Sequence, residues 1–235
     1  MMGDNTEKDK RKQIFKFIGI LLVTSIIFLG GAAGYKHLQK EDFKSNLDVH
    51  AAHVTKTPKL FEPKEQTIDN SIPLSEMLDL QKQAIDQGVN KEIAGTLRIP
   101  KISQKLAIYR GANQFTLSLG VATYYYDDAK MGNGNFVLAG HNMLQSGIMF
   151  SDLHQLVDGD AMDLVDQNDI YRYRVFRTRT VPKNVTFFNG TPEKGSILDL
   201  PEKGEKAKLT LFTCTADGQQ RYVVEGHLDE ILPNG

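Results

Sequence analysis

The chain has 235 residues, enough for one domain of about 150 residues with extensions. Its formal net charge is −1, so it lacks the broad basic field of nucleic-acid-binding proteins. Its single cysteine excludes an internal disulfide and a cysteine-rich metal site, and the absence of a glycine-rich phosphate-binding motif argues against a nucleotide cofactor.

The first predicted element is a membrane segment over residues 17–35, which carry no charge. About 20 apolar residues span a bilayer. Because residues 1–16 are rich in Lys and Arg, the positive-inside rule places them in the cytoplasm and the rest of the chain outside. A cleaved signal peptide is the alternative, since the small residues 30–34 would suit a signal peptidase. The length of the apolar run favours an uncleaved signal-anchor.

Residues 36–73 are polar and contain three prolines, which predicts an extracytoplasmic stalk. A domain follows over residues 74–235. It begins with a predicted helix over residues 74–88, whose apolar residues recur at roughly helical spacing and which Gly88 would end.

Residues 92–230 show short strand-like runs separated by Gly, Pro, Asn and Asp, which is typical of a mainly β barrel or sandwich, and we expect it to be antiparallel. A short helical turn is predicted near residues 149–156. The predicted strands are 96–99, 105–109, 135–139, 161–165, 170–176, 208–213 and 222–228.

The only thiol, Cys214, ends one of these runs, and Arg221 opens the next. A lone cysteine is often a buried packing residue. In an exported protein that cannot form an internal disulfide, however, a single thiol is more readily explained by reactivity. The connection over residues 215–220 is short, so thiol and guanidinium should lie near the same end of the sheet.

A cysteine nucleophile needs a base or cation that favours the thiolate and a donor for the oxyanion. His141 is the best candidate base, because it follows the apolar run 136–140 at a strand exit, where side chains face clefts. The other histidines lie in the predicted stalk (His37, His50, His53) or at framework positions (His154, His227).

Four motifs together resemble those of the sortases, the membrane-anchored cysteine transpeptidases of Gram-positive bacteria. Residues 210–214 read TLFTC and resemble the TLxTC motif, and residues 134–142 resemble the histidine motif. Arg221 matches the family's arginine, and residues 95–100 match a first-strand G-x-L-x-I-P signature. The resemblance covers about residues 92–230, and the motifs occur in the family's order.

The resemblance implies a closed eight-stranded sortase-type β-barrel with short helices, preceded by a transmembrane helix. Cys214 would attack the Thr–Gly bond of an LPxTG-type sorting signal and form a thioacyl enzyme. His141 would be the general acid, and Arg221 would hold the substrate and stabilise the oxyanion. Thr213 would line the site with its hydroxyl or its backbone. The acceptor would be the amine of the lipid II cross-bridge, so that surface proteins become attached to peptidoglycan.

The substrate's leucine and proline would lie in an apolar groove that includes the stretch 182–207, although this stretch could equally be a loop covering the barrel. The candidate groove residues are Ala139, Val185, Ile197 and Leu198, with Phe187 and Phe188 nearby.

The subclass expected from the resemblance is class A. The chain has an N-terminal apolar run, no second hydrophobic span near its end, and no D-P-aromatic lid motif in residues 36–92. Residues 120–126 depart from the pattern that family members often show before the histidine strand. No cofactor is required by this reading. Calcium is a further candidate, with Asp127, Asp128 and Glu193 or Asp199 as its ligands, although adjacent aspartates also mark solvated turns.

Two other functions remain open at this point. A cell-wall cysteine peptidase would hydrolyse its substrate, but papain-like folds place the cysteine before the histidine, which is the reverse of the order here. A membrane-tethered binding module with an inert buried cysteine is the third reading, and thiol labelling would separate it from the enzymes.

Overall fold

The computed structural model describes residues 32–45, 47, 54–55, 57–61, 72–184, 187–188 and 191–234. The chain divides into two compact units, residues 1–42 and 43–235. Of the first unit, residues 32–42 are described, and they are helical. The second unit contains the barrel and its helices.

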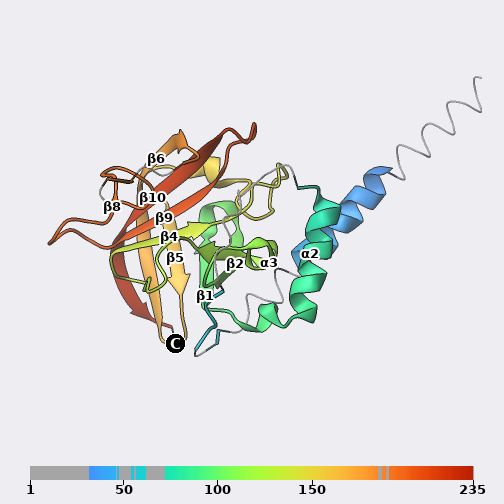
Figure 1. Ribbon diagram of the computed structural model, residues 1–235, viewed down its shortest axis with the longest axis horizontal. Coiled ribbons are helices and arrows are strands. Elements are labelled where there is room, and N and C mark those ends of the chain that lie inside the picture. The colour runs from blue at the N-terminus through green and yellow to red at the C-terminus, as the bar shows by residue number, and fades with distance from the viewer. Residues whose placement is uncertain are drawn as a thin grey trace, which may run out of the picture. The chain divides into compact units, whose positions relative to one another are not determined.

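Eight strands close into a barrel in the order β1-β2-β3-β4-β9-β10-β6-β5 (Figure 1). A two-stranded sheet, β7 with β8, lies in the long connection between β6 and β9. The barrel strands are β1 (Gly95–Ile99), β2 (Gln104–Tyr109), β3 (Val121–Thr123), β4 (Asn135–Ala139), β5 (Ala161–Val165), β6 (Asp169–Pro182), β9 (Lys208–Cys214) and β10 (Gln220–Pro233), and the small sheet consists of β7 (Phe187–Phe188) and β8 (Thr191–Pro192). The mainly β, eight-stranded closed barrel is therefore confirmed.

The expectation of an antiparallel sheet is wrong at two places, because β2 pairs with β3 and β4 pairs with β9 in parallel. Parallel neighbours need a crossover connection. Between β2 and β3 this crossover is α3 (Gln114–Leu119), a helix that the sequence analysis missed. Its start is fixed by a capping box, in which the Asn113 side chain accepts hydrogen bonds from the backbone of Phe115 and Thr116.

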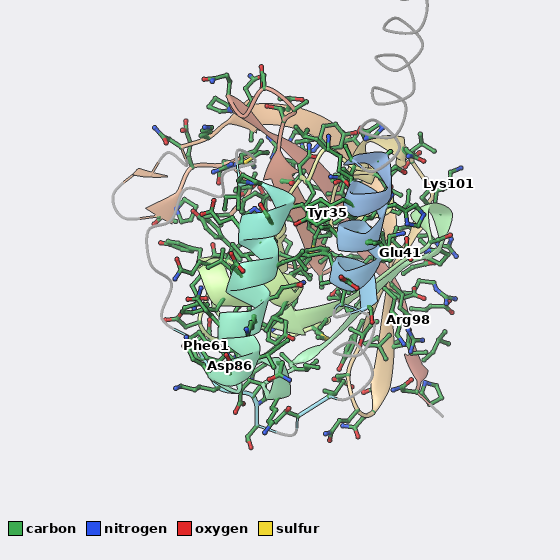
Figure 2. All side chains as sticks on the ribbon, turned by 90° about the vertical axis from the view of Figure 1, so that its right-hand side faces the viewer. Tyr35, Glu41, Phe61, Asp86, Arg98 and Lys101 are labelled. Atoms are coloured by element: carbon green, nitrogen blue, oxygen red, sulfur yellow. The ribbon has the colours of Figure 1, made fainter. Side chains whose placement is uncertain are left out.

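Alternation along the strands separates two apolar clusters. The interior cluster fills the barrel and includes Leu209 and Leu211 of β9. The outer cluster lies on the other face of the same strands and includes Phe212 and Cys214. The helix α2 (Leu74–Asp86) and α3 contribute to this outer cluster, and they are joined to each other by a hydrogen bond of 2.9 Å from Gln81 to the Ser118 carbonyl. Figure 2 looks onto α2, whose last residue, Asp86, is labelled.

The antiparallel pair of β6 and β10 is much longer than predicted. The two strands pair from Gln220 opposite Pro182 to Pro233 opposite Asp169, with two register irregularities. The extra residues carry arginines and acids that stay near solvent, so they lack the apolar alternation on which the predicted bounds 170–176 and 222–228 relied. In the region of the predicted helical turn 149–156, the structure has a 3-10 helix over Leu153–Gln155.

From Phe43 onward, the described residues of the predicted stalk 36–73 are part of the second unit. Phe43 and Leu47 are buried in the interior cluster, where Phe43 is fully covered. Further along, Thr55 N donates to Ile93 O at 2.7 Å and Phe61 N to Arg110 O at 3.0 Å. Apolar side chains at these positions attach the segment to the barrel, so over these residues it is not the free tether that its composition suggested.

The predicted transmembrane segment 17–35 lies outside the described residues except for residues 32–35. Within the described part of the chain, no helix is both long enough and apolar enough to cross a bilayer.

Candidate active site

The thiol of Cys214 and the guanidinium of Arg221 lie at the same end of the barrel wall. Cys214 is the last residue of β9, and it pairs directly with Arg221 across the antiparallel β9–β10 ladder. Nη1 of Arg221 donates a hydrogen bond to Sγ of Cys214 over 2.6 Å, and both residues are buried. A guanidinium that donates to sulfur stabilises a thiolate more than a thiol, so this pairing favours the nucleophilic form.

His141 reaches the same place from the other side of β9. Its strand, β4, runs parallel to β9 with Ala139 opposite Phe212, and Gly140 continues the pairing by donating to Phe212 O at 3.2 Å. His141 follows at once and is 3% exposed. A side chain at position 140 would meet the buried ring of Phe150, since a Cβ there would lie 2.6 Å from Cδ2. Glycine therefore allows Phe150 to pack beneath this turn.

The sequence prediction for Thr213 is only half compatible with this geometry. Successive side chains of a strand point to opposite faces. Cys214 belongs to the outer cluster, so Thr213 shares the face of Leu211, which is inside the barrel. The Thr213 hydroxyl is buried and has no hydrogen-bond partner among the residues that the structure describes. Only the backbone of Thr213 is placed to line the Cys214 side of the sheet.

The outer face beside Cys214 is covered by part of the long connection between β6 and β9. Ile197 and Leu198 are buried in the same cluster as Cys214, Phe212 and Ala139. Three of the four predicted groove residues are therefore together, and the fourth, Val185, lies outside the described residues.

Two polar side chains tie this covering segment to the barrel. The amide of Asn135, at the start of β4, donates to the carbonyls of Ile197 at 3.0 Å and Asp199 at 2.9 Å. Tyr126 donates its hydroxyl hydrogen to the Leu198 carbonyl at 2.7 Å. The Thr210 hydroxyl donates in turn to Asn135 Oδ1 at 2.8 Å, so the buried amide is held on both sides. The segment is thereby fixed to β4 and β9 rather than resting on apolar contact alone.

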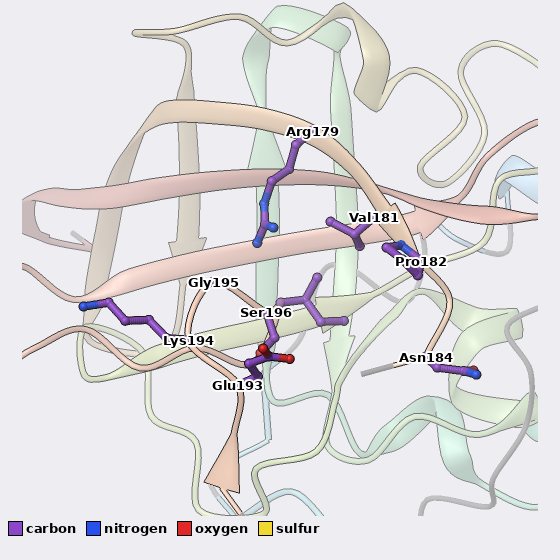
Figure 3. A pocket seen from close by; sticks show the side chains of 9 residues that line it. Arg179, Val181, Pro182, Asn184, Glu193, Lys194, Gly195 and Ser196 are labelled. Atoms are coloured by element: carbon purple, nitrogen blue, oxygen red, sulfur yellow. The ribbon is translucent and has the colours of Figure 1, made fainter. Parts of the chain in front are cut away.

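A pocket of about 190 Å³ opens next to this segment, between the end of β6 and the residues after β8 (Figure 3). Val181 and Ile197 give it an apolar wall, while Arg179 and Glu193 add charge. In Figure 3, Arg179 and Val181 project from one ribbon toward Ser196 on the other. The lining residues are Arg179, Val181, Pro182, Asn184, Glu193, Lys194, Gly195, Ser196 and Ile197.

Arg179 forms an ion pair with a buried acid, Glu225, which no pattern in the sequence indicated. Glu225 of β10 is completely buried and accepts hydrogen bonds from Nε of Arg177 at 2.6 Å and Nε of Arg179 at 2.9 Å. Lys208 Nζ lies 3.6 Å from its other oxygen. Burial alone would raise the pKa of Glu225, but the hydrogen bonds and charges of the two arginines outweigh it, and the pKa is lowered.

The predicted calcium ligands are not gathered into a site. Asp127 and Asp128 lie in the turn after β3, and Glu193 follows β8 and lines the pocket. Within the described ranges, no three Asp, Glu, His or Cys side chains are grouped as metal ligands. A use of calcium therefore stays a prediction from sequence resemblance.

The site thus offers a thiol, a guanidinium at hydrogen-bond distance and an imidazole just after the end of the neighbouring strand, beside buried apolar side chains. These are the groups that acyl transfer through a thioester requires: a nucleophile, a donor for the oxyanion, and a proton donor for the leaving amine. One further side chain belongs to this group. Asn142, directly after His141, donates from Nδ2 to the Cys214 carbonyl at 3.0 Å, a role that its place in the histidine motif did not indicate.

Comparison with known proteins shows which family the chain resembles. Residues 97–229 match the family model described as the Sortase domain. Sortase A of Bacillus anthracis is 30% identical over 223 residues, which cover 93% of this chain and 96% of that protein.

Solved structures show the same fold. The crystal structure of sortase A from Listeria monocytogenes has a TM-score of 0.52 and 27% identity, with coverage of 61% of this chain and 91% of that one. Sortase C1 of Streptococcus agalactiae has a TM-score of 0.51 and 30% identity, with coverage of 68% and 78%. This chain is therefore about equally similar to a structure named sortase A and to one named sortase C1.

Proposed function

The chain belongs to the sortase family of cysteine transpeptidases, and we propose that it is a class A enzyme that attaches surface proteins to the cell wall. Its substrate is an LPxTG-type sorting signal, cleaved between Thr and Gly. Its acceptor is the amine of the lipid II cross-bridge. The observation that carries the proposal is the 2.6 Å hydrogen bond from Arg221 to the Cys214 sulfur, at the strand end that His141 also reaches.

In the first half of the reaction, the Cys214 thiolate attacks the threonine carbonyl carbon and a C–S bond forms. The carbonyl oxygen becomes an oxyanion, which Arg221 stabilises by hydrogen bonding. The C–N bond to glycine then breaks, and His141 in its protonated form gives a proton to the departing amine. The product is a thioester on Cys214 and a free glycine amine.

In the second half, the acceptor amine attacks the thioester carbon and forms a new amide. His141, now neutral, takes the proton that the amine loses, and the C–S bond breaks to return the thiolate. Arg221 stabilises this second oxyanion and then pairs with the released sulfur.

The apolar residues of the signal enter the pocket beside Val181 and Ile197, whose wall is backed by the buried Ala139 and Leu198. Because Asn135 holds the backbone of Ile197 and Asp199, this wall is pre-formed and binding costs less ordering entropy. Thr213 lines the substrate site with its backbone only.

The class A assignment is supported by the match to Bacillus anthracis sortase A along nearly its whole length. Anchoring in the membrane through residues 17–35, with the catalytic domain extracytoplasmic, is proposed from the uncharged apolar run. Extraction of the full chain from membranes only by detergent, and its release by removing residues 1–35, would test this part.

The main test compares the wild type with Cys214→Ala on a fluorogenic LPETG peptide, with and without an amine acceptor. Wild type should cleave the peptide and, when the amine is present, yield the amide adduct by mass spectrometry, while the alanine variant does neither. Cleavage at the same slow rate by both proteins would rule out the sortase reaction.

The same experiment separates the alternatives. Cleavage that gives only free acid in the presence of the amine identifies a hydrolase. A Cys214 that resists a small thiol reagent in the folded protein, together with no cleavage, identifies a binding module with an inert thiol. Full labelling with loss of activity, together with the amide adduct, supports the transpeptidase.

A further inference from the structure

A side-chain hydrogen bond extends the pairing of β4 with β9 beyond the last backbone hydrogen bond between the two strands. Gly140 N donates to Phe212 O at 3.2 Å. In a parallel ladder, the next bond on this side would join the backbone N–H of Asn142 to the carbonyl of Cys214, two residues further along each strand. The structure places the side-chain amide of Asn142 there instead, and Nδ2 donates to Cys214 O at 3.0 Å.

The chain turns away from β9 at this point. Asn142 forms an isolated antiparallel bridge with Met149, within which Phe150 N donates to the His141 carbonyl at 3.0 Å. The second end of the Asn142 side chain is also used, because Oδ1 accepts from Leu144 N at 3.0 Å. One end of the amide faces a carbonyl and the other an N–H group, so a single orientation satisfies both. The side chain is therefore fixed at both ends.

We propose that Asn142 is a positioning residue: its amide ties the carbonyl of the nucleophile Cys214 to the turn that carries His141, and so sets the separation of thiol and imidazole. Cys214 is the last residue of β9. On one side it is held by its pairing with Arg221. On the other side β4 has already ended at Ala139, and the Asn142 amide supplies the missing hydrogen bond while the chain turns away.

Only the turnover measurement of this inference depends on the proposed function. A displacement of about 1 Å between reacting groups can cost on the order of 10²-fold in rate. Asn142→Ala removes the bond, and Asn142→Asp keeps the shape but places a carboxylate oxygen against the carbonyl. Both should lower kcat by roughly 30-fold or more, with KM within about three-fold of wild type, because the substrate groove is untouched.

The chain offers a matched control in Asn234→Ala. Asn234 Nδ2 also donates to a backbone carbonyl, that of Asp166, at 2.8 Å, and it follows the end of β10 opposite to Arg221. Asn142→Ala and Asn234→Ala should lower the thermal midpoint by similar, small amounts, while only the first lowers kcat. Loss of kcat in proportion to the unfolded fraction, or equal loss in both variants, would overturn the proposal.

A second measurement needs no peptide. The rate at which iodoacetamide alkylates Cys214 is recorded from about pH 5 to 9 for the wild type and both alanine variants. The profile should shift in Asn142→Ala and stay that of the wild type in Asn234→Ala, because only the first alters the surroundings of the thiol. Such a shift in a protein that does not turn over the peptide would reject the proposed function and keep the positioning role. Superimposable profiles in all three proteins would reject the positioning role.

Discussion

Arg221 and Cys214 are direct partners across the last paired residues of β9, so the guanidinium meets the sulfur from the neighbouring strand. The bond depends on the planar donor set of arginine, which lysine lacks. We expect Arg221→Lys to lower kcat/KM for the sorting peptide by about 10²-fold, and Arg221→Ala by up to about 10³-fold.

The matched control for this prediction is Arg174→Lys, since Arg174 lies on the exposed part of β6 and pairs with Asp229 near solvent. This variant should keep kcat/KM within roughly two-fold of the wild-type value, because surface ion pairs contribute little to stability. Equal activity of Arg221→Lys and Arg174→Lys would show that charge alone matters at position 221.

Thr213→Val tests which face of β9 contacts the substrate. The hydroxyl of Thr213 lies on the interior side, buried without a partner among the described residues, so its removal should leave kcat/KM within about two-fold. Stability should stay equal or rise by up to about 1 kcal/mol in urea unfolding.

Thr210→Val on the same strand is the control for that substitution. Its hydroxyl donates to Asn135 at 2.8 Å, and its loss leaves a buried amide oxygen unsatisfied, which should cost about 1–2 kcal/mol. A marked fall in kcat/KM for Thr213→Val would instead place its hydroxyl in contact with substrate.

Val181→Thr tests the pocket wall. The change keeps the volume of the side chain and adds a hydroxyl to the apolar surface that would meet the substrate. We expect KM for the sorting peptide to rise roughly five-fold at nearly constant kcat, the pattern of lost binding without lost chemistry. Val157→Thr, at a solvent-exposed valine, should change neither constant. A fall in kcat alone would contradict this assignment.

Glu225→Gln tests the buried acid that holds Arg177 and Arg179. Removing one partner of a buried ion pair is costly, and because the arginines reach solvent we expect about 2 kcal/mol at neutral pH. The folded-state pKa of Glu225 is lowered, so its contribution is fully present above the usual value of 4.5 and is lost as pH falls through the lower folded-state pKa.

The measurement is urea unfolding of wild type and variant as a function of pH. The stability difference between them should be constant above about pH 5 and shrink progressively below the usual pKa. If the stability difference between wild type and variant grew as the pH fell, the folded-state pKa of Glu225 would be raised and not lowered.

The sequence predicted the elements that carry a clear apolar run. The bounds 135–139 and 161–165 are those of β4 and β5, because nearly every residue there is buried and the pattern is unbroken. It missed the three-residue β3 and the six-residue α3, which are too short to show a period. It shortened β6 and β10, where charged side chains such as Arg177 and Arg179, paired with Glu225, and Glu230, paired with Arg172, replace apolar alternation.

The candidate site divides in the same way. Cys214, His141 and Arg221 follow from residue type and from their places at strand ends, and the structure brings Cys214 and Arg221 into contact. Asn142 and Glu225 could not be predicted, because their importance depends on which strands become neighbours. An asparagine after a histidine, or a glutamate in a strand, carries no local signal of the carbonyl or guanidinium that it will meet.

The parallel pairing of β4 with β9 has a consequence for how the enzyme becomes active as it folds. Arg221 and Cys214 are seven residues apart in the chain, whereas Asn142 and Cys214 are 72 apart. Closing the longer loop costs about 2 kcal/mol more in chain entropy, so the short hairpin forms more readily than the contact that brings in the histidine. Recovery of catalysis during refolding should therefore report closure of the whole barrel, and stopped-flow activity traces should follow the slowest structural probe.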